Sequence, residues 1–238
     1  FENGNLILLG DAFDRGPQVT ETLWFLHELD NEAKKVGGNV QLLLGNHEIM
    51  ALTGDHRYIH QKYEYFTAFT QMHYFQLFDK NSILGEWLRS QNAILQINNH
   101  LFMHAGISPA FSAYNYDFAE VNFILRNFLY SDFTILPNSP EENILGGNGP
   151  LWFRGYMNYG ERAPQVEQRF IDNYLDSVQV EIMFLGHNEQ KEISSSYEGK
   201  VISLDVFINE SGETAQGLLI KNQKLIRCHA DGSQEEIR

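Results

Sequence analysis

Short apolar runs separated by a helical pattern open the chain. Residues 6–9 and 40–44 are apolar runs of strand length, and between residues 19 and 33 apolar side chains recur at helical spacing until two glycines follow. A strand, a helix and a second strand in this order predict a parallel pair joined by a right-handed crossover. The carboxyl ends of both strands should then lie at the same edge of a sheet.

The rest of the chain predicts more helices and strands. Residues 55–92 carry aromatic side chains at helical spacing, and we expect a helical cap there whose aromatics are mostly buried. Helices are also expected over 117–130 and 164–178, a hairpin turn at Asn98-Asn99, and a loop over 137–150. Apolar runs predict further strands at 93–97, 101–103, 182–185, 201–204, 216–220 and 224–227. Antiparallel strands near the end of the chain favour an α/β domain with mixed sheets, spanning 1–238 as one unit.

Each of four predicted strands is followed by a polar block. The runs that end at residues 9 and 44 lead into GDAFDRG at 10–16 and GNHE at 45–48, and we expect both blocks to be loops. The runs that end at residues 103 and 185 lead into His104-Ala105-Gly106 and Gly186-His187. Open α/β sheets place their chemistry at the carboxyl ends of strands, so the four blocks should converge at one edge.

The residue types in these blocks are those of metal-assisted phosphoester cleavage. Two divalent ions about 3.5–4 Å apart activate water and neutralise charge on phosphoryl oxygens, and a bridging carboxylate keeps them at that separation. Asp11 is the candidate bridge, and Asn46, His104 and His187 are the candidates that complete the shell of one ion.

Three further side chains have candidate roles in phosphate binding and proton transfer. Arg15 offers planar donors that suit phosphate oxygens. His47 follows a candidate ligand, and it can protonate the leaving oxygen if a nearby carboxylate favours its cationic form. Asp14 is the candidate for that orienting carboxylate.

Composition limits the classes of partner. The chain carries 17 basic and 31 acidic residues, and its net charge of -14 opposes a general attraction to nucleic acid or to an anionic membrane. Cys228 is the single cysteine and excludes an intramolecular disulfide framework. No apolar stretch approaches the roughly 20 residues of a membrane span. The chain begins at Phe1 rather than Met, so an upstream leader and the choice between cytoplasm and periplasm stay open.

The blocks GDAFDRG, GNHE, HAG and GH resemble those of the calcineurin-like metallophosphoesterase superfamily, specifically its phosphoprotein phosphatase type. The sequence at residues 16–18, 54–58 and 151–156 is similar to that of the bacterial Shewanella-like protein phosphatases. The resemblance implies a four-layered α/β/β/α sandwich, two divalent ions of manganese, iron or zinc, and hydrolysis without a covalent phosphoenzyme. It implies the site roles given above, together with a second phosphate-binding arginine. Arg154 is the first candidate for that arginine and Arg57 the weaker one.

One block of the family has no counterpart in the chain. Its Asp-x-His block on the first strand supplies two ligands of the other metal ion, and nothing before Leu6 matches it. We expect an upstream strand and helix to precede Phe1 and to supply this block. The alternative is a chain that holds one and a half metal sites.

The leading functional hypothesis is hydrolysis of phosphomonoesters by metal-activated hydroxide. The expected substrates are phosphorylated Ser, Thr or Tyr in proteins or peptides, or a small phosphorylated molecule. The enzymatic alternative is cleavage of a dinucleoside polyphosphate or a phosphodiester, which the same metal core can perform. The alternative outside enzymes is a module that binds phosphate groups without turnover.

Overall fold

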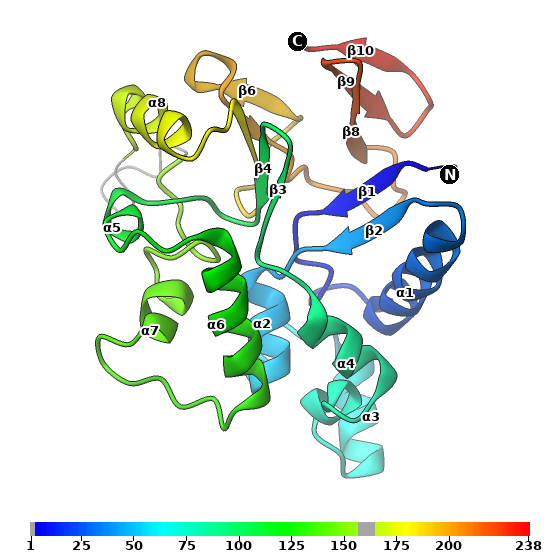
Figure 1. Ribbon diagram of the computed structural model, residues 1–238. Helices are drawn as coiled ribbons and strands as arrows, with labels where there is room; N and C mark the ends of the chain where they lie inside the picture. The colour runs from blue at the N-terminus through cyan, green and yellow to red at the C-terminus, as the bar shows by residue number, and fades with distance from the viewer. Residues whose placement is uncertain (1–2, 157–164) are drawn as a thin grey trace. The chain divides into compact units, whose positions relative to one another are not determined.

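The computed structural model describes residues 3–156 and 165–238, and the chain divides into two compact units (Figure 1). Unit 1 comprises Phe1–Ile94 and Tyr116–Gly146, and unit 2 comprises Leu95–Asn115 and Gly147–Arg238. The predicted loop over 137–150 therefore contains a boundary between units. The expectation of one domain that lacks its first strand and helix stays a prediction.

Unit 1 opens with the predicted strand, helix and strand. β1 (Asn5–Leu8) pairs in parallel with β2 (Asn39–Leu42), and α1 (Val19–Lys35) connects them (Figure 1, blue). The helix buries one apolar stripe, because Leu23 and Leu26 face the interior while Trp24 and Phe25 are exposed. The parallel register brings the ends of both strands, and the polar blocks that follow them, to one edge of this small sheet.

The other elements of unit 1 are helical. They are α2 (Asn46–Thr53), α3 (Gln61–Thr70), the 3-10 helix η1 (Tyr74–Phe78), α4 (Ile83–Ser90), α6 (Phe118–Tyr130) and α7 (Pro140–Leu145). The helical stretch predicted between residues 61 and 91 is present as α3, η1 and α4, whereas a helical cap over 55–92 stays a prediction. The helix predicted over 117–130 is confirmed and begins at an Asp117 cap. The predicted loop over 137–150 was wrong in its middle, because α7 begins there at a Ser139 cap followed by proline.

The aromatic residues of 55–92 divide between the core and the surface. Tyr74 and Phe78 are fully buried, and the Phe78 ring lies edge-on to Phe13 of the first polar block at 4.8 Å between centroids. Phe66 and Phe69 are exposed, at 36% and 90%, so their predicted burial was wrong. Helical spacing alone does not show which side of α3 faces the core.

Unit 2 contains a mixed sheet and a small antiparallel sheet. The mixed sheet has the order β3-β4-β5-β7-β6, and its strands are β3 (Ile94–Ile97, which starts at the last residue of unit 1), β4 (His100–Met103), β5 (Ile182–Leu185), β7 (Val201–Ser203) and β6 (Ser194–Ser196). β4, β5 and β7 run parallel, and β6 is antiparallel to β7. Asn98 adopts a positive φ of 54° between β3 and β4, as expected for the predicted turn.

The end of the chain forms the antiparallel sheet of β8 (Gln216–Lys221), β9 (Lys224–His229) and β10 (Gln234–Glu236). The helical elements in the described part of unit 2 are α5 (Pro109–Ser112), α8 (Gln168–Ser177) and the 3-10 helix η3 (Tyr197–Gly199). The helix predicted over 164–178 begins later, at Gln168, and residue 164 lies outside the described residues. Among the helices of the described ranges, none has the length and apolar composition needed to cross a membrane.

Candidate active site

The loop of residues 10–16 leaves β1 in an unusual backbone conformation. Asp11, Asp14 and Arg15 have positive φ angles of 58°, 70° and 59°. Residues other than glycine rarely adopt a positive φ, because this conformation costs on the order of 1–3 kcal/mol per residue. Residues with such strained backbones cluster at functional sites. The surrounding structure must therefore hold this loop in place.

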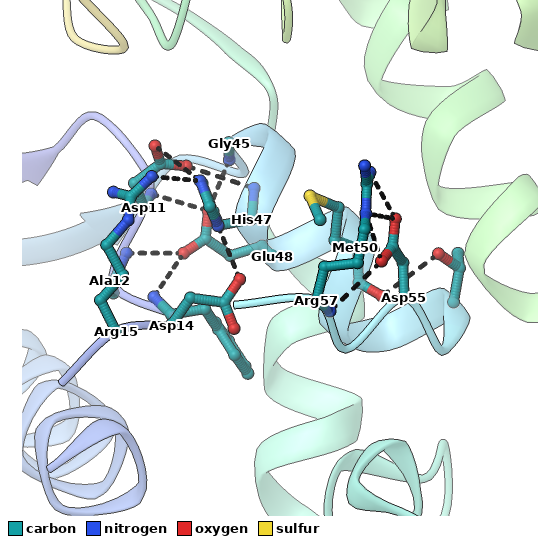
Figure 2. Close-up of polar contacts among 12 residues, drawn as sticks. Asp11, Ala12, Asp14, Arg15, Gly45, His47, Glu48, Met50, Asp55 and Arg57 are labelled. Carbon is teal, nitrogen blue, oxygen red and sulfur yellow. Dashed lines mark hydrogen bonds and ion pairs between the residues drawn. The ribbon is translucent and has the colours of Figure 1, made fainter. Parts of the chain in front are cut away.

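A buried carboxylate holds the loop. Glu48 is 0% exposed, and its two oxygens accept main-chain N–H groups of Asp11 at 2.8 Å, Ala12 at 2.7 Å, Phe13 at 3.3 Å and Gly45 at 2.7 Å (Figure 2). Charge-assisted bonds of this kind are the strong ones. One side chain thus ties both polar blocks of unit 1 together.

The block GNHE is the start of a helix, so its prediction as a loop was wrong. Gly45 caps α2, and Asn46, His47 and Glu48 form the first turn. Glu48 stands at the third helical position and accepts the N–H of the cap, which is half of a capping box. The positive end of the helix dipole therefore lies at the candidate ligand Asn46, which is 2% exposed.

His47 is fixed on both sides of its ring. Its Nδ1 lies 2.6 Å from Asp14 Oδ2, and both residues are buried (Figure 2). Its Nε2 lies 3.4 Å from Arg15 Nη2 and 4.0 Å from Asp11 Oδ2, while its main-chain N–H donates to Asp11 Oδ1 at 3.2 Å. Because Asp14 engages Nδ1, Nε2 is the nitrogen that faces Asp11, the candidate metal bridge, and Arg15, the candidate for phosphate binding.

Tyr58, which follows α2, packs against this half of the site. The ring of Tyr58 is centred 5.3 Å from the His47 ring, its centroid lies 5.6 Å from Arg15 Cζ, and its carbonyl accepts the Arg15 N–H at 2.8 Å. Sequence reasoning had given Tyr58 and Glu48 no role. The spacing of Gly45 and Glu48, which is that of a capping box, was a signal for the structural role of Glu48. For Tyr58 the signal was its place in the 54–58 segment that carries the family resemblance.

Arg57, the weaker candidate for phosphate binding, forms an ion pair with Asp55. Its guanidinium donates to both carboxylate oxygens of Asp55, at 2.8 to 3.0 Å (Figure 2). The Arg57 partner lowers the pKa of Asp55, and the pair is exposed to solvent.

Unit 2 holds the two candidate histidine ligands. His104 follows β4 and His187 follows β5, and the parallel pairing of these strands brings the two buried imidazoles together with His104 Nε2 3.0 Å from His187 Nδ1. His187 has a positive φ of 65°, and its Nε2 lies 3.2 Å from the carbonyl of Trp152. Two imidazole nitrogens this close together are donors that suit a first-row metal ion.

Arg154 is anchored beside His187. Its Nη1 donates to the His187 carbonyl and to Asn188 Oδ1, both at 3.2 Å. The HAG glycine also has a physical reason, because Gly106 has a φ of 112° and a Cβ there would lie 2.3 Å from the ring of Tyr156. The Tyr156 hydroxyl donates to the Ile107 carbonyl at 2.7 Å, which braces the segment after His104.

Each unit thus gathers part of the predicted set. Unit 1 brings Asp11, Asp14, Arg15, Asn46 and His47 to the ends of β1 and β2, and unit 2 brings His104, His187 and Arg154 together. A carboxylate, an amide and two imidazoles fit a divalent metal ion by donor chemistry. A shared centre built from both units stays a prediction.

The chain matches the calcineurin-like phosphoesterase family over residues 1–188. It belongs to that family. A cold-active protein tyrosine phosphatase of a psychrophilic Shewanella species is 36% identical, with a TM-score of 0.92 over 100% of this chain and 70% of that one. The family and the mixed α/β fold expected from the sequence are confirmed.

Curated relatives match over smaller parts of their length. The uncharacterised protein C1840.07c of Schizosaccharomyces pombe is 31% identical over 85% of this chain and 61% of its own. Shewanella-like protein phosphatase 2 of Arabidopsis thaliana is 42% identical over 24% of this chain and 15% of its own. A symmetrical bis(5'-nucleosyl)-tetraphosphatase of a Janthinobacterium species is 31% identical over 45% of this chain and 35% of its own. The chain therefore spans less than two thirds of each of these relatives.

Proposed function

We propose that the chain carries the catalytic part of a metal-dependent phosphatase that hydrolyses phosphomonoesters of Ser, Thr or Tyr in proteins or peptides. The observation that carries this proposal is the buried pair of Asp14 and His47, joined at 2.6 Å with Arg15 at the opposite side of the imidazole. That is a proton donor with an orienting carboxylate next to a phosphate-binding cation. The family and the protein tyrosine phosphatase relative support the same activity.

The metal ions would be held by Asp11, Asn46, His104 and His187. The family resemblance implies two such ions, of manganese, iron or zinc. When bound, such ions supply an activated water nucleophile and neutralise charge that develops on the phosphoryl oxygens. The donor types support this assignment. Elemental analysis of protein purified without added metal would identify the ion.

The chain's own residues would perform the remaining tasks. Arg15 and Arg154 would orient the phosphate group through their planar donors. His47 would protonate the leaving oxygen from Nε2, because Asp14 engages Nδ1 and so orients the imidazole. Glu48 would keep Asp11, Arg15 and the first turn of α2 in their mutual arrangement.

A second candidate activity is cleavage of a dinucleoside tetraphosphate. It is favoured by the 31% identity to the bis(5'-nucleosyl)-tetraphosphatase over 110 residues. The same metal core and proton donor serve this reaction equally well, so the substrate surface must decide between the two.

Steady-state kinetics of the natural full-length protein with manganese tests the proposal. We expect turnover of phosphopeptides with a higher kcat/KM than that of diadenosine tetraphosphate. An Asp11→Asn preparation made in parallel should lose this turnover and so exclude a contaminating phosphatase. Turnover of the nucleotide alone would overturn the proposal in favour of the second activity. Binding of phosphate without turnover of either substrate would overturn it in favour of a phosphate-binding module.

A further inference from the structure

Tyr58 places an exposed aromatic ring beside the two groups that would act on the phosphate ester. Its side chain is 43% exposed, although it packs 5.3 Å from the His47 ring and its centroid lies 5.6 Å from Arg15 Cζ. Its carbonyl accepts the Arg15 N–H at 2.8 Å, which fixes the residue relative to the loop of residues 10–16. The ring is thus held in position and still open to a ligand.

The position of the ring relative to the reaction follows from the roles of its neighbours. Arg15 would bind the phosphoryl oxygens, and His47 would contact the oxygen that leaves. The group attached to the leaving oxygen must therefore extend from the neighbourhood of His47, where the Tyr58 ring lies. In phosphotyrosine this group is a phenyl ring bonded directly to that oxygen, whereas in phosphoserine it is a methylene with no aromatic surface.

We propose that Tyr58 is a specificity-determining residue that contacts an aromatic leaving group, so that the site favours aryl phosphates such as phosphotyrosine over alkyl phosphates. This inference rests on the proposed phosphatase function and names its preferred substrate class. Aromatic pairs attract each other at centroid separations of 4.5–7 Å, beyond the effect of the area that they bury. Arg57, whose Cζ also lies 5.6 Å from the Tyr58 centroid, is held by Asp55 and helps to fix the ring.

A purely positional role for Tyr58 makes a different prediction. The contact with Arg15 is a cation–π interaction, so loss of the ring would also loosen the arginine. That effect would weaken phosphate binding equally for every substrate. Only a contact with the aryl group changes the ratio of kcat/KM between a substrate with an aromatic leaving group and one with an aliphatic leaving group.

The test compares two peptides of one flanking sequence, one with phosphotyrosine and one with phosphoserine. The kcat/KM ratio of the two peptides is measured for the wild type and for Tyr58→Ala, so that the different intrinsic reactivities of the esters cancel. We expect the ratio to shift against phosphotyrosine by about threefold to tenfold in Tyr58→Ala. Tyr58→Phe keeps the ring and should keep the wild-type ratio. Tyr65→Ala removes another exposed tyrosine, 64% exposed on α3, and should change neither rate.

Inhibition by phenylphosphonate and methylphosphonate gives a second measurement that requires no ester cleavage of the probe. The wild type should bind the phenyl compound more tightly, and Tyr58→Ala should lose most of that advantage. Equal losses for both peptides and both inhibitors in Tyr58→Ala would show that the ring acts through Arg15 alone and would overturn the inference. A wild type that cleaves neither peptide would instead overturn the proposed function, and the inference with it.

Discussion

The two halves of the predicted site are built in different ways. In unit 1, a loop with three non-glycine residues at positive φ is held by hydrogen bonds from its main chain to one buried carboxylate, that of Glu48. In unit 2, the histidines follow neighbouring parallel strands, and main-chain pairing continues past the strand ends, since Gly186 N donates to the His104 carbonyl at 2.8 Å. In unit 1 one side chain accepts most of the hydrogen bonds that hold the first polar block, whereas in unit 2 the register of a sheet holds the histidines.

This difference indicates where each half is vulnerable. A strand register is maintained by many bonds, so loss of one side-chain contact near it should move His104 and His187 little. A strained loop relaxes when the group that holds it is removed. We therefore expect that substituting a residue that holds the candidate site residues in place will lower activity more in unit 1 than in unit 2.

The largest effect is expected for Glu48→Gln. Glutamine keeps one acceptor oxygen and presents an N–H group where Glu48 accepted two main-chain donors. Each donor left without an acceptor costs about 1–3 kcal/mol, and a displacement of Asp11 and Arg15 by about 1 Å costs about 10²-fold in kcat/KM. Urea unfolding, phosphopeptide kinetics and elemental analysis should show losses of stability, activity and metal content together.

The matched substitution in unit 2 is Tyr156→Phe. It removes the hydroxyl bond to the Ile107 carbonyl, so we expect a loss of about 1 kcal/mol in stability and less than a tenfold loss in kcat/KM. If Tyr156→Phe lowered the activity as much as Glu48→Gln, the proposed contrast between the two halves would be wrong.

His47→Asn should change the chemistry of unit 1 without changing its architecture. Removal of a general acid lowers kcat by about 10²-fold or more, while the loop and its candidate ligands stay in place. Metal content by elemental analysis should match that of the wild type. If the metal were lost together with the activity, His47 would be a ligand and not the proton donor.

The sequence predicted where the candidate residues lie in the fold better than the way in which they are held. The paired strands, the α1 crossover and the histidines at strand ends follow from apolar periodicity, which is a local signal. The helices α2 and α7 were both missed, because the polar, glycine-containing sequence around their starts outweighed two capping patterns, Gly45-x-x-Glu48 and Ser139-Pro140-x-Glu142.

Contacts between distant segments account for the rest of what sequence reasoning missed. The main-chain partners of Glu48 in the first block lie 35 to 37 residues away, so its role depends on tertiary structure. The edge strands β6 and β10 are short and polar and carry no apolar alternation. The exposure of Phe69 depends on which side of α3 packs against its neighbours, and the spacing of aromatic residues does not determine that side.

The smallest expected effect concerns acid stability, which tests whether both units respond to pH through a half-buried histidine. Burial lowers the pKa of His56 in unit 1 and of His100 in unit 2 below the ordinary value of 6.5. His73 lowers the pKa of His56 further, whereas Asp14 and Asp55 oppose the shift. A depressed pKa in the folded state means that the unfolded chain binds more protons once the pH falls below 6.5, so stability is lost as the pH decreases from that value.

Urea unfolding between pH 7.5 and pH 5 should therefore show a fall in stability that His56→Gln and His100→Gln each reduce. The His56 Nε2 is buried without a hydrogen-bond partner among the described residues, and the His56 ring lies 5.6 Å from that of the fully buried Tyr74. Protonation of this nitrogen is therefore unfavourable, because no acceptor forms a hydrogen bond with it. Hydrogen exchange at pH 5 should place the destabilisation caused by His56 in unit 1, which already contains the strained loop. An unchanged pH profile in both variants would assign the acid sensitivity to the carboxylates instead.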